Sequence, residues 1–369
     1  MERAEGWTRL RTTALLFNAI FMGIGNCGNP LLTRLYFIGG GTRIWFSTWL
    51  QTVAWPVTFI PLFVSYLHHR RRRSQTSDSG EFQHITPFLF ISAFLIGLLM
   101  GLNNYLFTYG VSKLPVSTAL LIGSSQLGFT SVFAFFLVKQ KFTAFTINAV
   151  ILLTLSAVVL GVRAGTDRPA GESNKEYILG FALTVGSAAL LGLVLPLVEL
   201  SYSKVKMARI EYSMVLEFQM VLCFAATLFC TVGMFINDDF QVISREASEF
   251  ELGKTKYYLV TVGNAILTQC FYVGALGATS YGSSLMSMVI INVLLPITEL
   301  MAVVFYHEKF QAEKGISLFL SLWGFISYFY GDIQTNIKKK NQQPAAMQRP
   351  DAFCTTCQLK LNLLDSVTF

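Results

Sequence analysis

The sequence GLLMGLNNYLFTYG, residues 97–110, decides the class of fold, because it belongs to an apolar run that is too long for a soluble core. The run covers residues 86–110, and a helix needs about 20 apolar residues to cross a bilayer. Asn103 and Asn104 lie in this run. An amide that finds no partner in hydrocarbon costs about 4–8 kcal/mol on cyclohexane scales. The pair therefore predicts a polar partner or a ligand inside the membrane.

The composition extends this prediction to the whole chain. The 369 residues are 53% hydrophobic and only 13% charged, whereas soluble domains carry about 25% charged residues. Continuous apolar runs of this kind are typical of helices rather than of a membrane β-barrel. We therefore expect an all-α, polytopic membrane protein with ten transmembrane helices. The runs are 13–38, 44–67, 86–110, 116–138, 144–163, 177–200, 213–235, 257–280, 283–306 and 315–333.

The first run, 13–38, is too long for the apolar core of a signal peptide, so we expect it to be retained as a helix. The net charge of +7 is concentrated beside the runs, in Arg70–Arg73 and Lys338–Lys340. Such clusters indicate positive-inside anchoring rather than a nucleic-acid partner. With both termini in the cytosol, 17 of the 28 basic residues fall on the inner side, and the longest outer loop, 236–256, is net acidic.

Several residues recur at nearly constant spacing. Gln219 follows Gln51 by 168 positions, and Gln269 follows Asn103 by 166. This spacing predicts a duplication of five helices, and an odd number inverts the second copy in the membrane, as in many transporters. We expect two inverted five-helix repeats between short tails. The predicted segments are a cytosolic N-terminal tail (1–12), a first half (13–163), a connecting loop (164–176), a second half (177–333) and a cytosolic C-terminal tail (334–369).

Amide and aromatic side chains inside the runs are the candidate ligands for a substrate. An amide offers a donor and an acceptor together, which matches the edge of a planar heterocycle, and aromatic rings offer stacking faces. For any single residue the alternative is a hydrogen bond between helices, worth about 0.6–2 kcal/mol. Adjacent residues on a helix point about 100° apart, and we expect Asn103 rather than Asn104 to bind the ligand. The substrate-binding candidates are Asn18, Asn26, Trp49, Gln51, Asn103, Tyr105, Gln219 and Gln269.

Charged residues narrow the substrate class. No Lys or Arg lies deep in a run, and Arg34 and Arg43 border the turn that follows the first one. A carrier of phosphorylated solutes would need buried cations, so this class is disfavoured. Desolvation favours the neutral form of a carboxyl group, which lets it take up and release protons. Glu217 and Glu299 are the predicted proton-coupling residues, the alternative being pairing with a neighbouring amide or Lys. An ionised Glu217 would favour a protonated amine, such as a cationic alkaloid.

Signals for an enzyme or for a bound metal are missing from the sequence. The four histidines do not form an H-E-x-x-H pattern, and no G-x-S-x-G motif or P-loop occurs. The C-x-x-C pattern at Cys354 and Cys357 has no second pair, which zinc sites usually need. The sequence therefore predicts no catalytic residues, no cofactor and no metal.

Two long blocks resemble the plant purine permeases, a branch of the drug/metabolite transporter superfamily. They are GNPLLTRLYFIGGGTRIWFSTWLQTVAWP (28–56) and NVLLPITELMAVVFYHEKFQAEKGISLFLSLWGFISYFYGD (292–332), and the resemblance covers essentially all the runs. It implies ten transmembrane helices in two inverted halves. It also implies proton-coupled uptake of adenine-like bases, cytokinins and related alkaloids. It supplies no set of binding residues.

The resulting hypothesis is a proton-driven importer of a heterocyclic substrate that works by alternating access. We expect it in the plasma membrane, with the vacuolar and ER membranes as alternatives. A non-transporting receptor or assembly protein is the second hypothesis, and the internal repeat counts against it. A carrier of phosphorylated solutes is the third, and the missing buried cations count against it.

Overall fold

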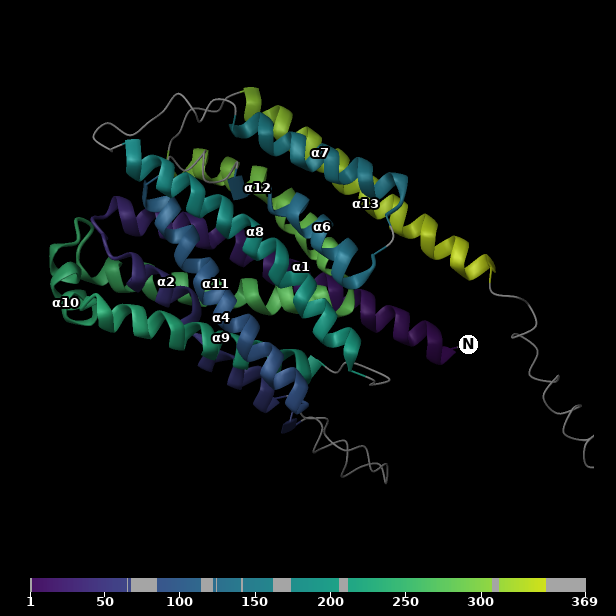
Figure 1. The fold of residues 1–369 in the computed structure, drawn as a ribbon, viewed down its shortest axis with the longest axis horizontal. Coiled ribbons are helices and arrows are strands. Elements are labelled where there is room, and N and C mark those ends of the chain that lie inside the picture. Colours follow the sequence, from purple (N-terminus) through teal and green to yellow (C-terminus); the bar gives the residue numbers. More distant parts are fainter. Residues whose placement is uncertain are drawn as a thin grey trace, which may run out of the picture.

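The computed structural model describes residues 2–64, 66–67, 85–113, 122–123, 125–140, 142–161, 174–205, 212–306 and 312–342. This part of the chain is entirely helical apart from turns and short connections (Figure 1). Its helices are α1 (Glu2–Ile38), α2 (Ile44–Val53), the 3₁₀ helix η1 (Trp55–Thr58), α4 (Pro87–Lys113), α6 (Gln126–Val138), α7 (Ala144–Gly161), α8 (Asn174–Lys204), α9 (Tyr212–Ile236), α10 (Asp239–Glu249), α11 (Lys254–Tyr281), α12 (Ser284–Tyr306) and α13 (Ala312–Gln342).

Five of the described helices, α1, α4, α8, α9 and α11, contain segments long and apolar enough to cross a membrane. The apolar segments in α6, α7 and α12 are shorter within the described residues. Backbone N–H and C=O groups in hydrocarbon must be paired inside the chain, which a helix achieves by itself. The chain is thus a polytopic helical membrane protein.

Two predicted segments differ from the observed elements. In the run 44–67, α2 ends at Val53 and the chain tightens into η1, because Pro56 has no N–H to donate. The predicted loop 236–256 contains the amphipathic helix α10. Its residues Ile243 and Ala247 share one face by i, i+4 spacing and pack against the core with Phe250. A loop assignment based on net charge overlooked this spacing.

Three of the helix contacts each have a counterpart elsewhere in the bundle. The pair α1–α11 corresponds to α8–α4, the pair α4–α9 to α11–α2, and the pair α6–α8 to α12–α1. The helices α7 and α13 pack against each other at one edge of the bundle (Figure 1).

Glycine allows the closest of these contacts. A Cβ atom on Gly25 of α1 would collide with backbone atoms of Leu267 and Phe271 in α11. A Cβ on Gly274 of α11 would collide with backbone atoms of Asn18 and Met22 in α1. Small residues let helices approach closely in membranes, where packing replaces the hydrophobic effect as the source of association. The two glycines therefore set the separation of α1 and α11.

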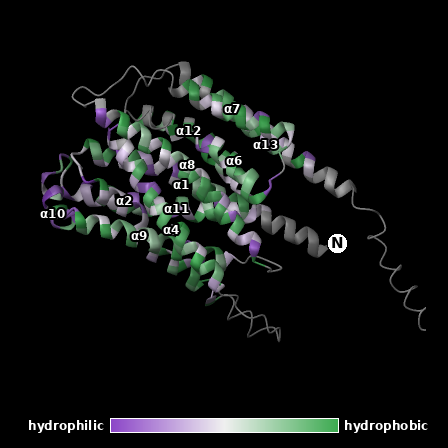
Figure 2. Ribbon diagram, viewed as in Figure 1, coloured by the Kyte–Doolittle hydropathy of each residue, from purple (hydrophilic) through white to green (hydrophobic). Residues whose placement is uncertain are grey.

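Large apolar side chains cover the outside of the bundle, and several polar side chains are buried inside it among the apolar core residues. Phe136 is 71% exposed and Ile236 is 76% exposed, whereas Asn18, Gln219 and Asn264 are buried. Figure 2 shows hydrophobic residues along most of the helices and hydrophilic residues gathered at helix ends and around α10. Large exposed apolar areas are rare on soluble proteins, so this surface faces lipid.

A buried polar cluster ties α10 to the ends of α1, α2 and α11. The carboxylate of Glu246 accepts hydrogen bonds from the Tyr36 hydroxyl at 2.9 Å, the Thr42 backbone N–H at 2.7 Å and the Tyr257 hydroxyl at 3.3 Å. Arg43 Nη1 donates to Asp239 Oδ1 at 3.3 Å. Burial raises the pKa of the Asp239 carboxyl, although the Arg43 guanidinium acts to lower it. This cluster fixes the turn between α1 and α2, which lies beside the site.

Candidate functional site

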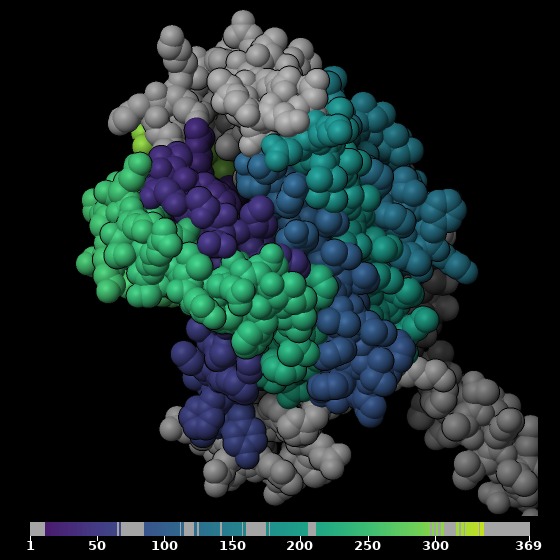
Figure 3. Space-filling view, turned by 60° about the vertical axis from the view of Figure 1, so that its left-hand side comes forward, coloured from purple at the N-terminus to yellow at the C-terminus, as the bar shows by residue number. Residues whose placement is uncertain are grey.

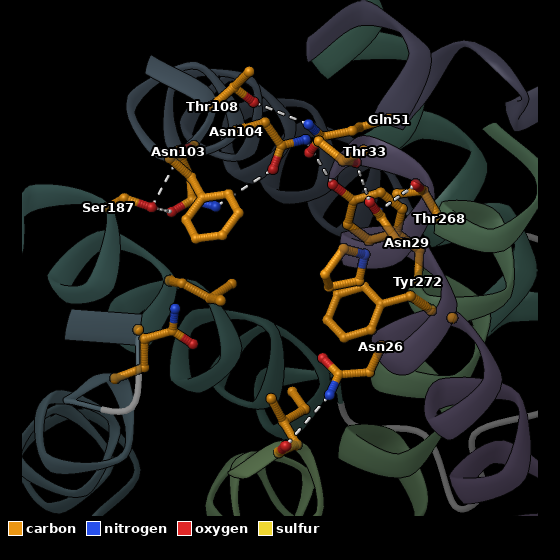
Figure 4. Close-up of a pocket in the computed structure, with 18 of the residues that line it drawn as sticks. Asn26, Asn29, Thr33, Gln51, Asn103, Asn104, Thr108, Ser187, Thr268 and Tyr272 are labelled. Atoms are coloured by element: carbon orange, nitrogen blue, oxygen red, sulfur yellow. Dashed lines mark hydrogen bonds between the residues drawn. The ribbon is translucent and has the colours of Figure 1, made fainter. Parts of the chain in front are cut away.

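A cavity of about 430 Å³ lies between α1, α2, α4, α6, α8, α11 and α12. Sites for small molecules usually measure about 300–1,000 Å³. Figure 4 shows Asn103 and Ser187 on one side of the cavity and Asn26 and Asn29 on the other. The polar lining residues are Asn26, Asn29, Thr33, Arg34, Gln51, Asn103, Asn104, Thr108, Gln126, Ser187, Thr268 and Tyr272.

One wall consists of a stripe on α1. Asn26, Asn29 and Thr33 follow one another at i, i+3 and i+7, so they share a helix face. Asn29 Nδ2 donates to Thr268 Oγ1 at 2.6 Å, and the Thr33 hydroxyl donates to Asn29 Oδ1 at 3.0 Å. Asn26 Nδ2 lies 3.4 Å from the Ile291 carbonyl oxygen. These bonds orient the amides while leaving each of them capacity for a ligand.

The opposite wall contains both asparagines of α4. The Ser187 hydroxyl donates to Asn103 Oδ1 at 2.9 Å. Asn103 Nδ2 lies 3.4 Å from Asn104 Oδ1, and Asn104 Nδ2 donates to the Tyr272 hydroxyl at 2.8 Å. We expected one asparagine to face the cavity and the other to bind a neighbouring helix. In the structure both line the cavity and both have interhelical partners.

The six amides of the described cavity lining all come from residues 26–126. Beyond the four asparagines they are Gln51, whose Nε2 donates to Thr108 Oγ1 at 3.0 Å, and Gln126 at the start of α6. Beyond residue 126, the polar side chains of the described lining are the hydroxyl groups of Ser187, Thr268 and Tyr272. Hydroxyl groups lie on both sides of the cavity, since Ser187 bonds to Asn103 and Thr268 bonds to Asn29. The described lining does not include Gln219 or Gln269, the later amides that the sequence analysis expected there.

Three of the eight substrate-binding candidates, Asn26, Gln51 and Asn103, line this cavity. Three others are occupied elsewhere in the structure. Asn18 packs against Gly277, and its Oδ1 lies 3.5 Å from the Tyr212 hydroxyl. Trp49 Nε1 donates to Thr231 Oγ1 at 3.0 Å, and the Tyr105 ring stacks on Trp45 with 4.0 Å between centroids.

The remaining two candidates bind each other. Gln219 Nε2 donates to Gln269 Oε1 at 3.2 Å, and Gln269 Nε2 donates to the Thr52 carbonyl oxygen at 3.2 Å. Both side chains are buried and lie outside the cavity lining. Their hydrogen bonds join α9, α11 and α2. A buried amide can be satisfied by a partner on another helix just as it can by a ligand.

Of the two predicted proton-coupling residues, Glu217 lies apart from the lining. Glu217 Oε2 accepts a hydrogen bond from the Ile85 backbone N–H at 2.7 Å, just before α4 begins. Glu299 falls in α12, but its side chain lies outside the described residues. Among the described residues no carboxylate lines the cavity, and Arg34 is its charged side chain. The position of Arg34 differs from our expectation that this cation only borders a turn.

Several lining residues are missing from the predicted substrate-binding residues. Asn29 and Thr33 could have been found from their helical spacing with Asn26. The aromatic residues Phe37, Phe107 and Phe271 line the cavity in place of Trp49 and Tyr105. Their type is too common in apolar helices to serve as a signal. The same is true of the hydroxyl residues, since serine and threonine occur at many helix contacts.

The cavity extends toward the end of the bundle that carries α10, because its lining on α1 continues to Phe37 and Ile38. Figure 3, which brings that end forward, shows α1 (purple) and α4 (blue) on either side of the hollow. Toward the opposite end the core is closed by apolar residues, including Met100, Val198 and Met214. At that end Glu199 Oε2 also accepts a hydrogen bond from the Ser284 N–H at 2.6 Å.

The chain is similar to known purine transport proteins. A family model described as purine nucleobase transmembrane transport matches residues 13–339. Purine permease 3 of Arabidopsis thaliana is 52% identical over 337 residues, covering 91% of this chain and 95% of that protein. Purine permease 2 of the same plant is 51% identical over 353 residues, covering 93% and 98%. One chain solved by crystallography has a similar fold, with a TM-score of 0.58 at 14% identity over 86% of this chain and 96% of that chain.

Proposed function

The chain belongs to the plant purine permease family of purine nucleobase transporters, and on that premise we propose that it imports adenine, cytokinins or related heterocycles by proton-coupled alternating access. The proposal includes a plasma-membrane location with both termini in the cytosol. The observation that carries the proposed binding of a heterocycle is the cavity of about 430 Å³ with six amides on its walls.

The amides are suited to the edge of a purine. Asn and Gln pair with adenine in a bidentate manner, because the amide presents a donor beside an acceptor. Asn103 is the proposed partner, because the Ser187 hydroxyl orients its oxygen at 2.9 Å and its Nδ2 makes only a long contact of 3.4 Å with Asn104. Asn26 and Gln51 lie on other walls. Phe107 and Phe271 line the same cavity and are the proposed stacking partners.

The proposed mechanism is a movement of two inverted halves about this cavity. The equivalence of the helix pairs α1–α11 and α8–α4 supports a duplication. With cytosolic termini, the end that carries α10 faces outward, and the cavity extends toward that end. The structure would then correspond to an outward-facing state, closed on the cytosolic side by the apolar cluster around Met100, Val198 and Met214.

The charge of the lining separates the candidate substrates. A cationic alkaloid would require an acidic partner in the cavity, and within the described lining there is none. Neutral purines and cytokinins are therefore favoured over protonated alkaloids. The coupling proton is proposed to bind Glu217, which lies outside that lining, or Glu299.

The proposal is tested by uptake into yeast that expresses the chain. The panel contains radiolabelled adenine, a cytokinin, an alkaloid and pyridoxal phosphate. Adenine and the cytokinin should be taken up, and Asn103→Ala should abolish this uptake while the amount of protein at the surface is unchanged. The matched control is Asn148→Ala, because Asn148 is an exposed amide on α7 that bonds to Ser327.

Three outcomes would contradict parts of the proposal. Unchanged uptake by Asn103→Ala would mean that this asparagine only joins helices. No uptake of any compound by intact surface protein would favour a receptor or an assembly protein. Selective uptake of pyridoxal phosphate would favour a carrier of phosphorylated solutes.

A further inference from the structure

The boundaries of several later helices repeat those of earlier ones at a constant distance along the chain. The helix α2 begins at Ile44 and α9 begins at Tyr212, which is 168 positions later. The helix α4 ends at Lys113 and α11 ends at Tyr281, again 168 positions later. The ends of α6 and α12 have the same spacing, and those of α1 and α8 lie 166 positions apart. These spacings define which residues are counterparts under the proposed duplication.

A second, small cavity of about 20 Å³ adjoins the large one. The residues that line both cavities, called the shared level below, are Met100, Leu191, Phe271, Tyr272 and Ile291. Beyond the shared level the small cavity continues along α8 and α11, away from the end that carries α10, because α11 begins beside α10. Its volume is sufficient for about one water molecule. A purine therefore cannot pass beyond the shared level in this structure.

The lining of the small cavity corresponds to the outer lining of the large one. Leu276, which lines only the small cavity, is the counterpart of Thr108, which lines only the large cavity. In the same way Leu195 is the counterpart of Asn29. Under the duplication, the small cavity thus lies where the second half would form its own version of the outer cavity. The two versions differ in chemistry, because leucines replace a hydroxyl group and an amide.

Gln219 lies on the same side of the shared level and has Gln51 as its counterpart. Each glutamine lies seven residues after the first residue of its helix. The side chain of Gln219 is fully buried, and within the described part of the chain its Oε1 has no hydrogen-bond partner, although its Nε2 donates to Gln269. An unpaired buried acceptor destabilises the conformation that contains it. A conformation that exposes this oxygen to water or to a substrate would relieve that cost.

We propose that Leu195, Leu276 and Gln219 line the path by which substrate leaves on the cytosolic side, and that substrate binds more weakly on this path than in the outer cavity. The inference rests on the proposed function, because it assumes alternating access by two inverted halves. When the halves exchange conformations, the residues of one half take the roles of their counterparts in the other. The leucines at 195 and 276 offer no hydrogen bonds, so the inner side favours release.

The path is tested by the face of the membrane from which two counterpart positions react. The full chain carrying Gln219→Cys or Gln51→Cys is placed in right-side-out and inside-out yeast membrane vesicles. An impermeant methanethiosulfonate reagent is added, and peptide mass spectrometry measures modification at each position. Position 219 should react at least fivefold faster from the cytosolic face, and position 51 at least fivefold faster from the outer face. Native Cys230, which is buried further along α9 and outside both described linings, is the internal control and should react slowly from either face.

The difference in affinity is tested by adenine exchange from each face at equal pH on both faces. In the unaltered protein the half-saturation constant should be at least fivefold higher on the cytosolic face. Leu276→Thr introduces the residue of its counterpart, so it should lower the cytosolic constant relative to the outer constant at least threefold. The matched control is Leu153→Thr, which makes the same change at a buried leucine of α7 outside both linings. It should leave the ratio of the two constants unchanged.

The inference is overturned if position 219 reacts from neither face or mainly from the outer face, or if Leu276→Thr leaves the ratio unchanged. If Gln219→Cys does not reach the membrane, Leu276→Cys decides the same question, because it lies on the same path. If the unaltered protein exchanges no adenine, the proposed function fails. The modification experiment does not depend on transport, so it still decides which face of the membrane reaches position 219.

Discussion

Asn104 and Tyr272 are joined by a hydrogen bond across the bundle, from Asn104 Nδ2 to the Tyr272 hydroxyl at 2.8 Å, although they lie 168 positions apart in the sequence. The same spacing separates Gln51 from Gln219. Under the proposed duplication, a bond between equivalent positions lies on the axis that relates the halves. A movement of the halves would therefore change this bond in the wall of the cavity.

We expect the Asn104–Tyr272 bond to couple the stabilities of the two side chains. Tyr272→Phe removes the acceptor and leaves a buried amide N–H unpaired, and Asn104→Ala leaves the hydroxyl unpaired. Each change should lower the free energy of unfolding by about 1–3 kcal/mol. The double variant should lose less than the sum of the two, as measured by thermal unfolding in detergent. Tyr330→Phe is the control, because the Tyr330 hydroxyl bonds to Gln334 on the exposed surface. Strictly additive losses would show that the two side chains act independently.

Gln51 and Gln219 occupy equivalent positions under the proposed duplication, but of the two only Gln51 lines the cavity. Gln51→Leu should therefore raise the KM for adenine uptake by about tenfold, because a bidentate contact contributes about 1–3 kcal/mol. Gln219→Leu breaks the bond to Gln269 and should lower thermal stability while leaving the KM unchanged. The measurement is initial uptake rate against adenine concentration, corrected for surface protein. An equal rise in KM for both variants would place both amides at the substrate.

Glu246 should contribute more to stability than the neighbouring exposed Glu249. Glu246→Gln replaces an acceptor-only group by an amide, which cannot accept from Tyr36, Thr42 and Tyr257 in the same geometry. We expect a loss of about 1.5–3 kcal/mol, typical of hydrogen bonds to a charged group. Glu249→Gln breaks an exposed pair with Arg245 and should change little. Unfolding temperatures in detergent compare the two. Equal effects would mean that the buried cluster does not stabilise α10.

Gly274 should tolerate no side chain, because a Cβ there would meet the backbone of α1 at Asn18 and Met22. Gly274→Ala must separate α1 from α11, so we expect a loss of about 1–3 kcal/mol and reduced expression. Gly128→Ala in α6 is the matched control, since a Cβ there meets no atom within 4 Å. It should be neutral or slightly stabilising, because alanine favours the helix. Similar yields and unfolding temperatures for the two variants would show that α1 adjusts freely.

Coupling to protons should depend on Glu217 or Glu299. A glutamine at 217 keeps a carbonyl oxygen that can accept from the Ile85 N–H, so Glu217→Gln should preserve the fold and remove only the titrating proton. At least one of Glu217→Gln and Glu299→Gln should lose the stimulation of adenine uptake by an acidic exterior. Glu251→Gln on the exposed surface should keep it. Persistence of the stimulation in both single variants and in the double variant would place the coupling group elsewhere.

The amino-acid sequence by itself determined that the chain is helical and crosses a membrane, because continuous apolar runs have that single stable solution in lipid. It also determined the family, through two long blocks that include Asn29 and Asn292. It identified the kind of side chain in the site, since a buried amide needs a partner wherever it lies. These properties depend on local composition and length.

The tertiary structure alone decided which amides face the cavity. A helix that is apolar on nearly every side carries little information about its rotation, so Gln51 and Gln219 are indistinguishable until their neighbours are known. One lines the cavity and the other binds Gln269. The sequence also leaves the direction of Arg34 open, because a side chain near a helix end can point into solvent or into the cavity. Only the packing of α1 against α11, which Gly25 and Gly274 allow, directs its stretch of helix toward the site.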